Sequence, residues 1–298
     1  MTAFHCARIQ SPAKVNLHLD ILGTRQDGFH DIRSLFVMTT FSDTIEIEAL
    51  DQGSGFELKG FFSCTVEDNL ITKAVRLFCR NAGISCDFRV SVEKRIPEGA
   101  GLGGGSSNAA AVLRVLDKIF PDAFSKNELC TIAAELGSDV PFFLSSTSAI
   151  VEGRGELVTP VFPRDDYHLL LILPDIRVNT AMAYKWFDAE IKEEDKQLSL
   201  TKEEIKKWYM NPDPVKWPFF NTFYPVIKNH HPEYRLIEEL CRTMKVNFTV
   251  LSGSGACFAG VFTDQHDVDL MAQHVVENDM ICFAARPLVS MPEIEFFT

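Results

Sequence analysis

Apolar and polar residues alternate through much of the first third of the chain, as they do in half-buried β-strands. Glycines between the alternating runs, among them Gly28 in the Asp27-Gly28 pair, supply turns. The predicted strands cover residues 7–22, 35–41, 44–49, 56–59 and 88–94. Apolar residues take a helical spacing over 69–81, and Gly83 stands where that helix should end. Two more helices are predicted, over 107–120 and from Ser125 to Gly137, where Glu128 completes a capping box.

The pattern restarts after residues 160–166, a charged segment with prolines between two apolar runs. Beyond it the predicted order is β-α-β-β-α-β with extra helices in the first crossover, which is typical of a ferredoxin-like domain. The predicted strands of this part cover 168–173, 246–251, 257–262 and 281–288. The sequence therefore predicts an α+β protein of two domains, a mixed α/β domain over 1–160 and a ferredoxin-like domain over 161–298.

Composition narrows the classes of function. Of 298 residues 46% are hydrophobic, which is enough for a large core, and 29 Lys and Arg against 41 Asp and Glu give a net charge of −12. This balance disfavours nonspecific binding to nucleic acid or anionic membranes and favours a small soluble substrate. The eight cysteines form no C-x-x-C pair, and neither a signal peptide nor a membrane-length apolar run is present. We expect a cytoplasmic protein.

The most informative segment is rich in glycine and joins the strand over 88–94 to an alanine-rich helix. We call it the glycine segment; its residues are Pro97, Glu98, Gly99, Ala100, Gly101, Leu102, Gly103, Gly104, Gly105, Ser106 and Ser107. Its glycines let the backbone approach a ligand closely. Helix N–H groups, the helix dipole and the two serine hydroxyls converge on one place, which suits a polyphosphate.

Other interpretations of the glycine segment fit less well. A flexible linker would rarely join a strand to an apolar helix. Gly99, Gly101 and Gly104 satisfy the G-x-G-x-x-G pattern, but a dinucleotide-binding unit would continue into a second parallel strand, whereas Pro121 and another helix follow. A Walker-type loop is excluded because the chain contains no Gly-Lys dipeptide.

Three polar groups elsewhere are candidates for chemistry. Lys14 and Asn16 are two residues apart on an early strand and so share one side, although a strand lysine usually faces solvent. Asp139 precedes an apolar run, where it could equally cap a short helix. Phe29 and His30 end a polar turn and could stack on and hydrogen-bond a planar base, although a plain hairpin loop explains them as well.

Further motifs are weak or missing. A second glycine turn, residues 252–256, taken alone is a hairpin. The histidines form no H-E-x-x-H pair, so no protein metal site is predicted, and no G-x-S-x-G elbow supports serine hydrolysis.

Taken in order, these segments resemble the GHMP kinases over nearly the whole chain. The matching segments are Ser-Pro-Ala-Lys-Val-Asn-Leu at 11–17, Asp-Gly-Phe-His at 27–30, Glu-Asp-Asn-Leu-Ile at 67–71, the glycine-rich run at 97–110, Gly-Ser-Asp-Val-Pro-Phe-Phe at 137–143 and Gly-Ser-Gly-Ala-Cys at 253–257. Within the family the resemblance implies ATP-dependent phosphorylation, with Mg²⁺, of the 2-hydroxyl of a cytidine diphosphate-linked methylerythritol in isoprenoid precursor biosynthesis.

The resemblance also implies roles for residues. Lys14 and Asp139 become the catalytic pair, and the glycine segment becomes the phosphate loop. The neighbours of the adenosine are Asn69 and Lys94, and the contacts of the cytidine half are Asn16, Phe29 and His30. We expect a monomer or a homodimer.

The match departs from the family pattern at three places. Position 138 is Ser where Ala is common, position 29 is Phe where Tyr is common, and Asn221 is followed by Thr rather than by an acid, which leaves the role of Asn221 open.

Two alternatives remain. A GHMP kinase for mevalonate or homoserine would not need the Asp-Gly-Phe-His turn. A non-catalytic ligand-binding relative would have lost the lysine, the aspartate or the loop serines, and all of these are present.

Overall fold

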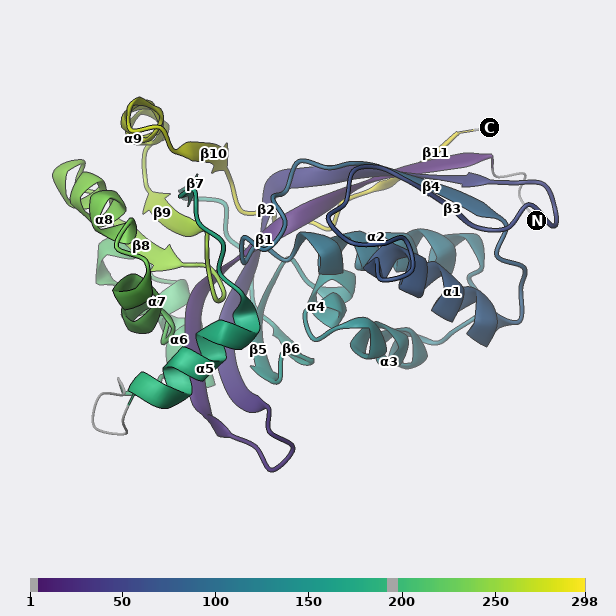
Figure 1. Cartoon of the computed structure of the whole chain (residues 1–298), viewed down its shortest axis with the longest axis horizontal. Coiled ribbons are helices and arrows are strands. Elements are labelled where there is room, and N and C mark those ends of the chain that lie inside the picture. Colours follow the sequence, from purple (N-terminus) through teal and green to yellow (C-terminus); the bar gives the residue numbers. More distant parts are fainter. Residues whose placement is uncertain (1–4, 192–197, 298) are drawn as a thin grey trace.

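The computed structural model describes residues 5–191 and 198–297, which form two β-sheets with helices packed against them (Figure 1). The strands of the larger sheet are β1 (Cys6–Thr24), β2 (His30–Ala49), β3 (Glu57–Lys59), β4 (Phe88–Glu93), β5 (Ser148–Gly153), β6 (Leu157–Pro160) and β11 (Ile294–Phe297). The strands of the smaller sheet are β7 (His168–Leu173), β8 (Phe248–Leu251), β9 (Phe258–Phe262) and β10 (Ile281–Ala285). All neighbouring strands are antiparallel except β3 and β4.

Strands β1 and β2 form a long ribbon that extends from one part of the molecule into the other (Figure 1). One half of β2 pairs with β4 and the other half with β5. The prediction of two strands over 35–41 and 44–49 is wrong, because β2 continues through Ser42 and Asp43. The polar pair resembles a turn in the sequence, yet both residues are buried, and Asp43 accepts hydrogen bonds from the N–H groups of Arg95 and Ile96.

Helices cover the larger sheet on one face and bury a first apolar core against it (Figure 1). They are α1 (Leu70–Ala82), α2 (Gly104–Ile119), α3 (Lys126–Leu136) and α4 (Val140–Ser145). Their ends follow local signals. Asn69 caps α1 and Gly83 ends it in the left-handed conformation, and the capping box of Ser125 and Glu128 is present on α3. Helix α2 begins at Gly104, earlier than predicted, because its two leading glycines adopt helical geometry.

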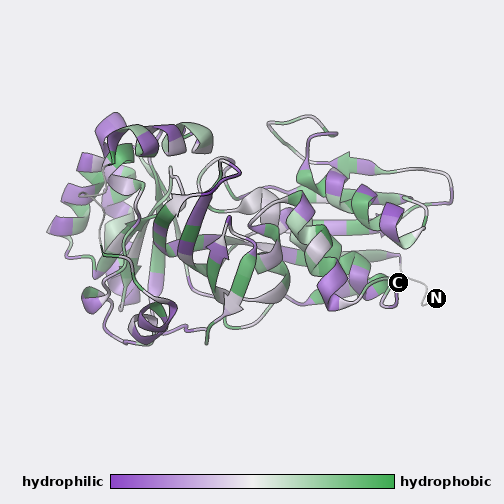
Figure 2. Ribbon diagram, turned by 90° about the horizontal axis from the view of Figure 1, so that it is seen from below, coloured by the Kyte–Doolittle hydropathy of each residue, from purple (hydrophilic) through white to green (hydrophobic). Residues whose placement is uncertain are grey.

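The smaller sheet has the strand order β10-β7-β9-β8, which confirms the predicted ferredoxin-like split βαβ arrangement. Its helices are α5 (Thr180–Glu190), α6 (Lys202–Tyr209), α7 (Tyr224–His230), α8 (Tyr234–Thr243) and α9 (Gln265–Glu277). In Figure 2 the surface helices alternate between polar and apolar residues, as amphipathic helices do.

The end of the chain differs from the prediction. The strand expected over 281–288 stops at Ala285, and β11 then returns to the larger sheet, where it pairs with β1. A division at residue 160 therefore assigns β11 to the wrong sheet, because its pairing partner lies far away in the sequence. The two-domain division itself stays a prediction.

A second apolar core joins the two sheets, with Val15 and Leu17 from β1 and Leu169 and Leu171 from β7. The loops at this junction carry the candidate site.

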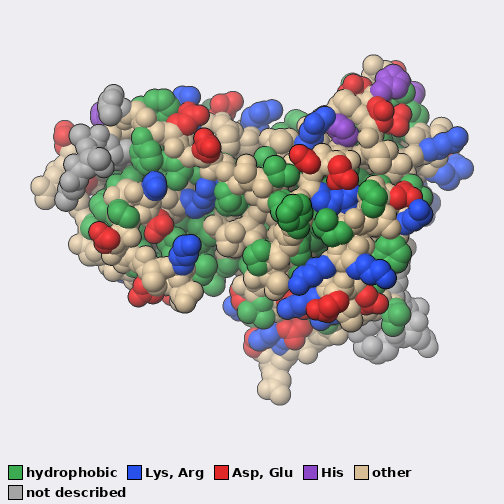
Figure 3. Space-filling model, turned by 180° about the vertical axis from the view of Figure 1, so that it is seen from behind, with side chains coloured by type: hydrophobic (Ala, Val, Ile, Leu, Met, Phe, Trp, Pro, Cys, Tyr) green, Lys and Arg blue, Asp and Glu red, His purple; other side chains and the backbone are tan. Residues whose placement is uncertain are grey.

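Within the described residues, no helix has both the length and the apolar character needed to cross a membrane. Asp and Glu side chains lie among the Lys and Arg side chains on the rear face (Figure 3).

Candidate active site

The glycine segment is shaped by the backbone around it. Gly103 is the N-cap of α2 with φ +69°, and no side chain caps this helix. The first hydrogen bond inside α2 runs from the N–H of Ser107 to Gly103, so the preceding N–H groups have no partner within the helix. Gly101 has φ +74°, and a Cβ there would overlap the carbonyl oxygen of Ser252. Only glycine fits this position without displacing the second glycine turn.

A cleft of about 340 Å³ lies over this helix end. Among the residues that line it are Pro97, Glu98, Gly99, Ala100, Gly101, Leu102, Gly103, Gly104, Gly105, Ser106, Asn69, Lys94, Ser63 and Asp68. Ser107 does not face it: Ser107 is buried, and its hydroxyl accepts a hydrogen bond from the hydroxyl of Ser11 at 2.8 Å. Of the two serines, Ser106 is therefore the one that borders the cleft.

Lys94 and Asn69 form part of the cleft wall. The ammonium of Lys94 donates to the carboxylate of Asp43 at 2.7 Å and to the carbonyl of Ile96 at 2.8 Å. Asn69 accepts a hydrogen bond from the N–H of Ile71 at 2.9 Å. These bonds hold both side chains in place at the cleft.

Lys14 and Asn16 lie on the same side of β1, as predicted. The Lys14 ammonium donates to Asn16 Oδ1 at 2.5 Å, lies 3.6 Å from Asp139 Oδ2, and sits 4.6 Å from the centre of the Phe36 ring. The main-chain N–H of Lys14 donates to the carbonyl of Leu102 at 2.9 Å. The strand that carries the lysine is thus bonded directly to the glycine segment.

The two members of this ion pair differ in exposure. Burial lowers the pKa of Lys14, and the nearby Asp139 carboxylate opposes this shift. Asp139 is 30% exposed. It occupies the N-cap position of α4 without making a side-chain capping bond, so the capping interpretation does not account for its carboxylate.

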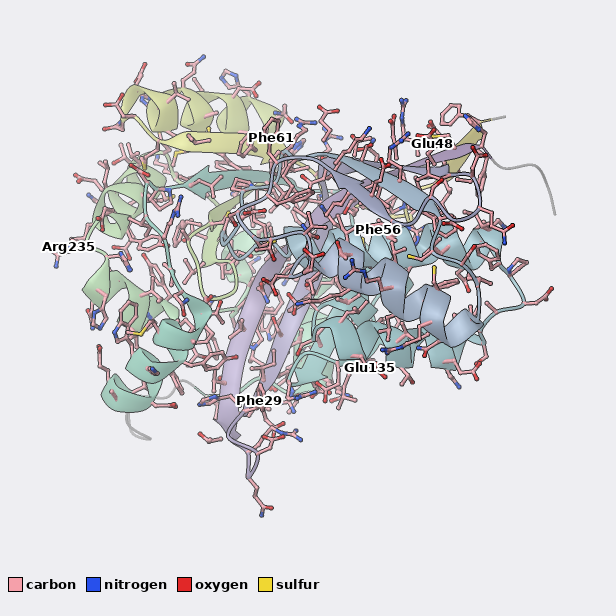
Figure 4. The ribbon with its side chains drawn as sticks, turned by 45° about the vertical axis from the view of Figure 1, so that its right-hand side comes forward. Phe29, Glu48, Phe56, Phe61, Glu135 and Arg235 are labelled. Atoms are coloured by element: carbon pink, nitrogen blue, oxygen red, sulfur yellow. The ribbon has the colours of Figure 1, made fainter. Side chains whose placement is uncertain are left out.

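Phe29 and His30 lie at the far end of the β1–β2 ribbon, where Figure 4 labels Phe29, and His30 contacts α5. Phe29 is 54% exposed, and the guanidinium of Arg154 lies 4.9 Å from the centre of its ring. His30 stacks on Tyr184 at 4.6 Å, and its Nε2 lies 2.7 Å from Asp188. Phe29 is thus largely exposed, with Arg154 over its ring, whereas His30 is packed.

The sequence interpretation missed Tyr184, whose ring stacks on His30 and packs against Phe223. Burial raises the pKa of Tyr184 to about 12, and the charges of Asp139 and Asp188 act in the same direction. At the turn after β5, a Cβ on Gly155 would lie 3.5 Å from Asp139 Oδ1. No local signal marks Tyr184, because its spacing in α5 is that of an ordinary amphipathic helix.

The structure describes no group of three His, Cys, Asp or Glu residues that could hold a metal ion within residues 5–191 and 198–297. The site therefore has three parts. They are the N-terminus of α2 with its adjoining cleft, the buried Lys14 paired with Asp139, and the turn that carries Phe29 and His30, which we call the aromatic turn.

Comparisons with known proteins agree with this arrangement. The model of the GHMP kinases N terminal domain matches residues 69–147. The 4-diphosphocytidyl-2-C-methyl-D-erythritol kinase of Treponema pallidum is 34% identical over 265 residues, which cover 87% of this chain and 91% of the relative. The kinase of the same name from Thermotoga maritima is 39% identical over 229 residues, which cover 76% and 82%.

A solved structure shows the same fold. It is a crystal structure of 4-(cytidine 5'-diphospho)-2C-methyl-D-erythritol kinase, which matches with a TM-score of 0.82 and 30% identity over 94% of this chain and 98% of that one. The chain is thus a small-molecule kinase of the GHMP superfamily, and it belongs to the family of 4-diphosphocytidyl-2-C-methyl-D-erythritol kinases.

Proposed function

We propose that this protein transfers the γ-phosphoryl group of ATP to the 2-hydroxyl of 4-diphosphocytidyl-2-C-methyl-D-erythritol. One observation carries the proposal: the buried Lys14, which is paired with Asp139, lies against the N-terminus of α2. A Cβ on Gly103, the N-cap, would lie 3.1 Å from Lys14 Cγ. A phosphate on this helix end would therefore lie close to both charged groups.

In this proposal the glycine segment binds the ATP phosphates through its N–H groups, and Asn69 and Lys94 neighbour the adenosine. Asp139 takes the proton of the attacking hydroxyl. The hydroxyl oxygen forms a bond to the γ-phosphorus as the bond to the β,γ-bridging oxygen breaks, and ADP leaves. Lys14 lies beside that carboxylate and offsets the negative charge on the moving group.

Mg²⁺ would reach this site mainly on the nucleotide phosphates. The donors at the cleft suit it, because Mg²⁺ prefers oxygen ligands and usually has few from the protein. The hydroxyl of Ser106 borders the cleft where the phosphates would lie, and it would hold the ion. When bound, the ion would neutralise phosphate charge.

The aromatic turn supports a cytidine-bearing substrate over mevalonate or homoserine. Phe29 offers an exposed ring for stacking on the base, and His30 lies beside it. Asn16, next to Lys14, would contact the same half of the substrate. An acyclic alcohol would leave this turn without a ligand.

The proposal is tested by a coupled assay of ADP release with three substrates: 4-diphosphocytidyl-2-C-methyl-D-erythritol, called the cytidyl alcohol below, mevalonate and homoserine. We expect activity with the cytidyl alcohol alone, and phosphorus NMR of the product should show a new phosphate monoester. Equal or greater turnover of mevalonate or homoserine would move the protein to the alternative kinases, and ATP binding without turnover of any alcohol would favour a non-catalytic role. We also expect a monomer or homodimer by light scattering and a cytoplasmic location by cell fractionation.

A further inference from the structure

We infer that Asn221 is a positioning residue that holds the second glycine turn against the glycine segment, an inference that rests on the ATP site proposed above. The Asn221 amide nitrogen donates to the carbonyls of Leu251 and Gly253, each at 2.7 Å, and its Oδ1 accepts from the N–H of Phe223 at 2.9 Å. Both amide hydrogens and the oxygen are used. The side chain is 5% exposed, so it does not contact substrate from solvent.

The two carbonyls held by Asn221 lie on either side of Ser252, and Ser252 connects to the site. Its hydroxyl donates to the carbonyl of Gly101 at 3.0 Å and accepts from the N–H of Asn16 at 3.2 Å. Asn16 in turn accepts from the Lys14 ammonium. A chain of hydrogen bonds therefore runs from Asn221 through the second glycine turn to the glycine segment and to the lysine.

The contact between the turn and the glycine segment leaves little room for movement. The N–H of Cys257 donates to the carbonyl of Ala100 at 3.0 Å. A Cβ on Gly253 would lie 3.4 Å from Gly101 Cα. Because the two backbones touch, a shift of the turn would displace the backbone that is proposed to bind phosphate.

Asn221 is itself fixed to the strand that carries Lys14. The N–H of Leu19 donates to the carbonyl of Phe220 at 2.8 Å, and the N–H of Thr222 donates to the carbonyl of Leu19 at 2.9 Å. Asn221 therefore fixes the position of the second glycine turn relative to β1. It affects ATP binding through Ser252 and Gly101 and does not contact ATP itself.

The test replaces Asn221 by Asp, which keeps the shape but sets a carboxylate oxygen against two carbonyl oxygens. The matched control is Thr222→Val, which removes hydrogen bonds from the Thr222 hydroxyl to Leu19 and Asp20 in the same segment without touching the turn. Calorimetry with an unhydrolysable ATP analogue, kcat and thermal unfolding are measured for each variant.

We expect Asn221→Asp to weaken binding of the analogue and to lower kcat by about tenfold or more each, while Thr222→Val stays within about twofold of wild type. Amide exchange of Gly255 and Cys257 should accelerate in Asn221→Asp only. If Asn221→Asp is folded and binds the analogue as wild type does, the inference is wrong, and Asn221 serves only to fix the backbone that precedes α7.

A second variant tests the inference in case Asn221→Asp does not fold. Ser252→Ala removes the hydroxyl that joins the turn to Gly101 and Asn16, and it should weaken analogue binding about fivefold or more; wild-type affinity would overturn the inference. Wild-type protein that binds the analogue but phosphorylates no cytidyl alcohol would refute the proposed function alone, because analogue binding does not require the alcohol. Wild-type protein that does not bind the analogue would refute both.

Discussion

The ammonium of Lys14 lies 3.6 Å from the carboxylate of Asp139, within a site where the lysine is buried and the aspartate is partly open to solvent. The Asp139 side chain makes no capping bond to α4. The carboxylate thus faces the Lys14 ammonium rather than a backbone N–H of α4, and its partial exposure leaves it open to an approaching hydroxyl group.

Replacing Asp139 by Asn should lower kcat by about 10²–10⁴-fold, the range that general-base catalysis supplies. Asn retains the size of the side chain and loses no capping bond, so ATP affinity should change little, but the melting temperature should fall because the buried Lys14 ammonium loses its ion-pair partner. Steady-state kinetics, calorimetry and thermal unfolding check this outcome. Asp269→Asn on the surface of α9 is the control. Near-normal kcat in Asp139→Asn would mean that the substrate hydroxyl loses its proton directly to the γ-phosphate rather than to Asp139.

Lys14 should produce an alkaline limb in the pH profile of kcat. Burial lowers its pKa, so the ammonium loses its proton at lower pH than an exposed lysine, and activity should fall as pH rises through that pKa. In Lys14→Arg the guanidinium stays charged, so any residual activity should lack this limb. Profiles of kcat for both proteins up to about pH 10.5 test this. An unchanged limb in Lys14→Arg would assign it to another group.

Gly103→Ala should weaken ATP binding by at least about tenfold, because the new Cβ would lie 3.0 Å from the Phe143 ring and 3.1 Å from Lys14 Cγ. Gly83→Ala is a matched control. Gly83 has nearly the same positive φ, +65° against +69°, yet nothing lies within 4 Å of its Cβ position. Calorimetry should show normal ATP affinity for Gly83→Ala. Equal affinities for both variants would remove the glycine segment from the phosphate site.

Phe29→Ala should raise KM for the cytidyl alcohol by about 5-fold to about 150-fold, since loss of one stacking contact costs about 1–3 kcal/mol. The KM for ATP and the melting temperature should stay near wild type, because Phe29 is 54% exposed. Phe162→Ala, which removes another exposed ring, is the control. A larger effect on ATP than on the alcohol would place Phe29 on the adenosine side.

His18 should make stability depend on pH. Burial lowers its pKa from 6.5 to about 3, and its Nε2 has no partner within the described residues. As pH falls below about 6.5 the unfolded state binds the proton first, so the free energy of unfolding should fall, by up to about 1.4 kcal/mol per pH unit, until about pH 3. In urea unfolding series, His18→Phe should flatten this dependence and His266→Gln, at an exposed site, should not. Parallel curves for His18→Phe and wild type would contradict the assignment.

Local signals predicted the local structure well. The Asn69 cap, the Gly83 stop and the capping box at Ser125 all lie within a few residues of the backbone groups they satisfy, so sequence alone placed α1 and α3 closely. The glycine segment was predictable for the same reason. Its conformational freedom and the helix that follows it are properties of neighbouring residues.

The site needed the tertiary structure. Lys14 and Asp139 were paired only through resemblance, and their distance depends on how β1 and α4 each pack against α2. Tyr184 and Asp188 of α5 contact His30, which is far from them in the sequence. The hydroxyl of Ser107 is hydrogen-bonded to Ser11 and does not face the cleft. Composition and periodicity determined which residues form strands and helices. Packing and pairing between distant segments decided which polar groups meet, because those contacts carry no local signature in the chain.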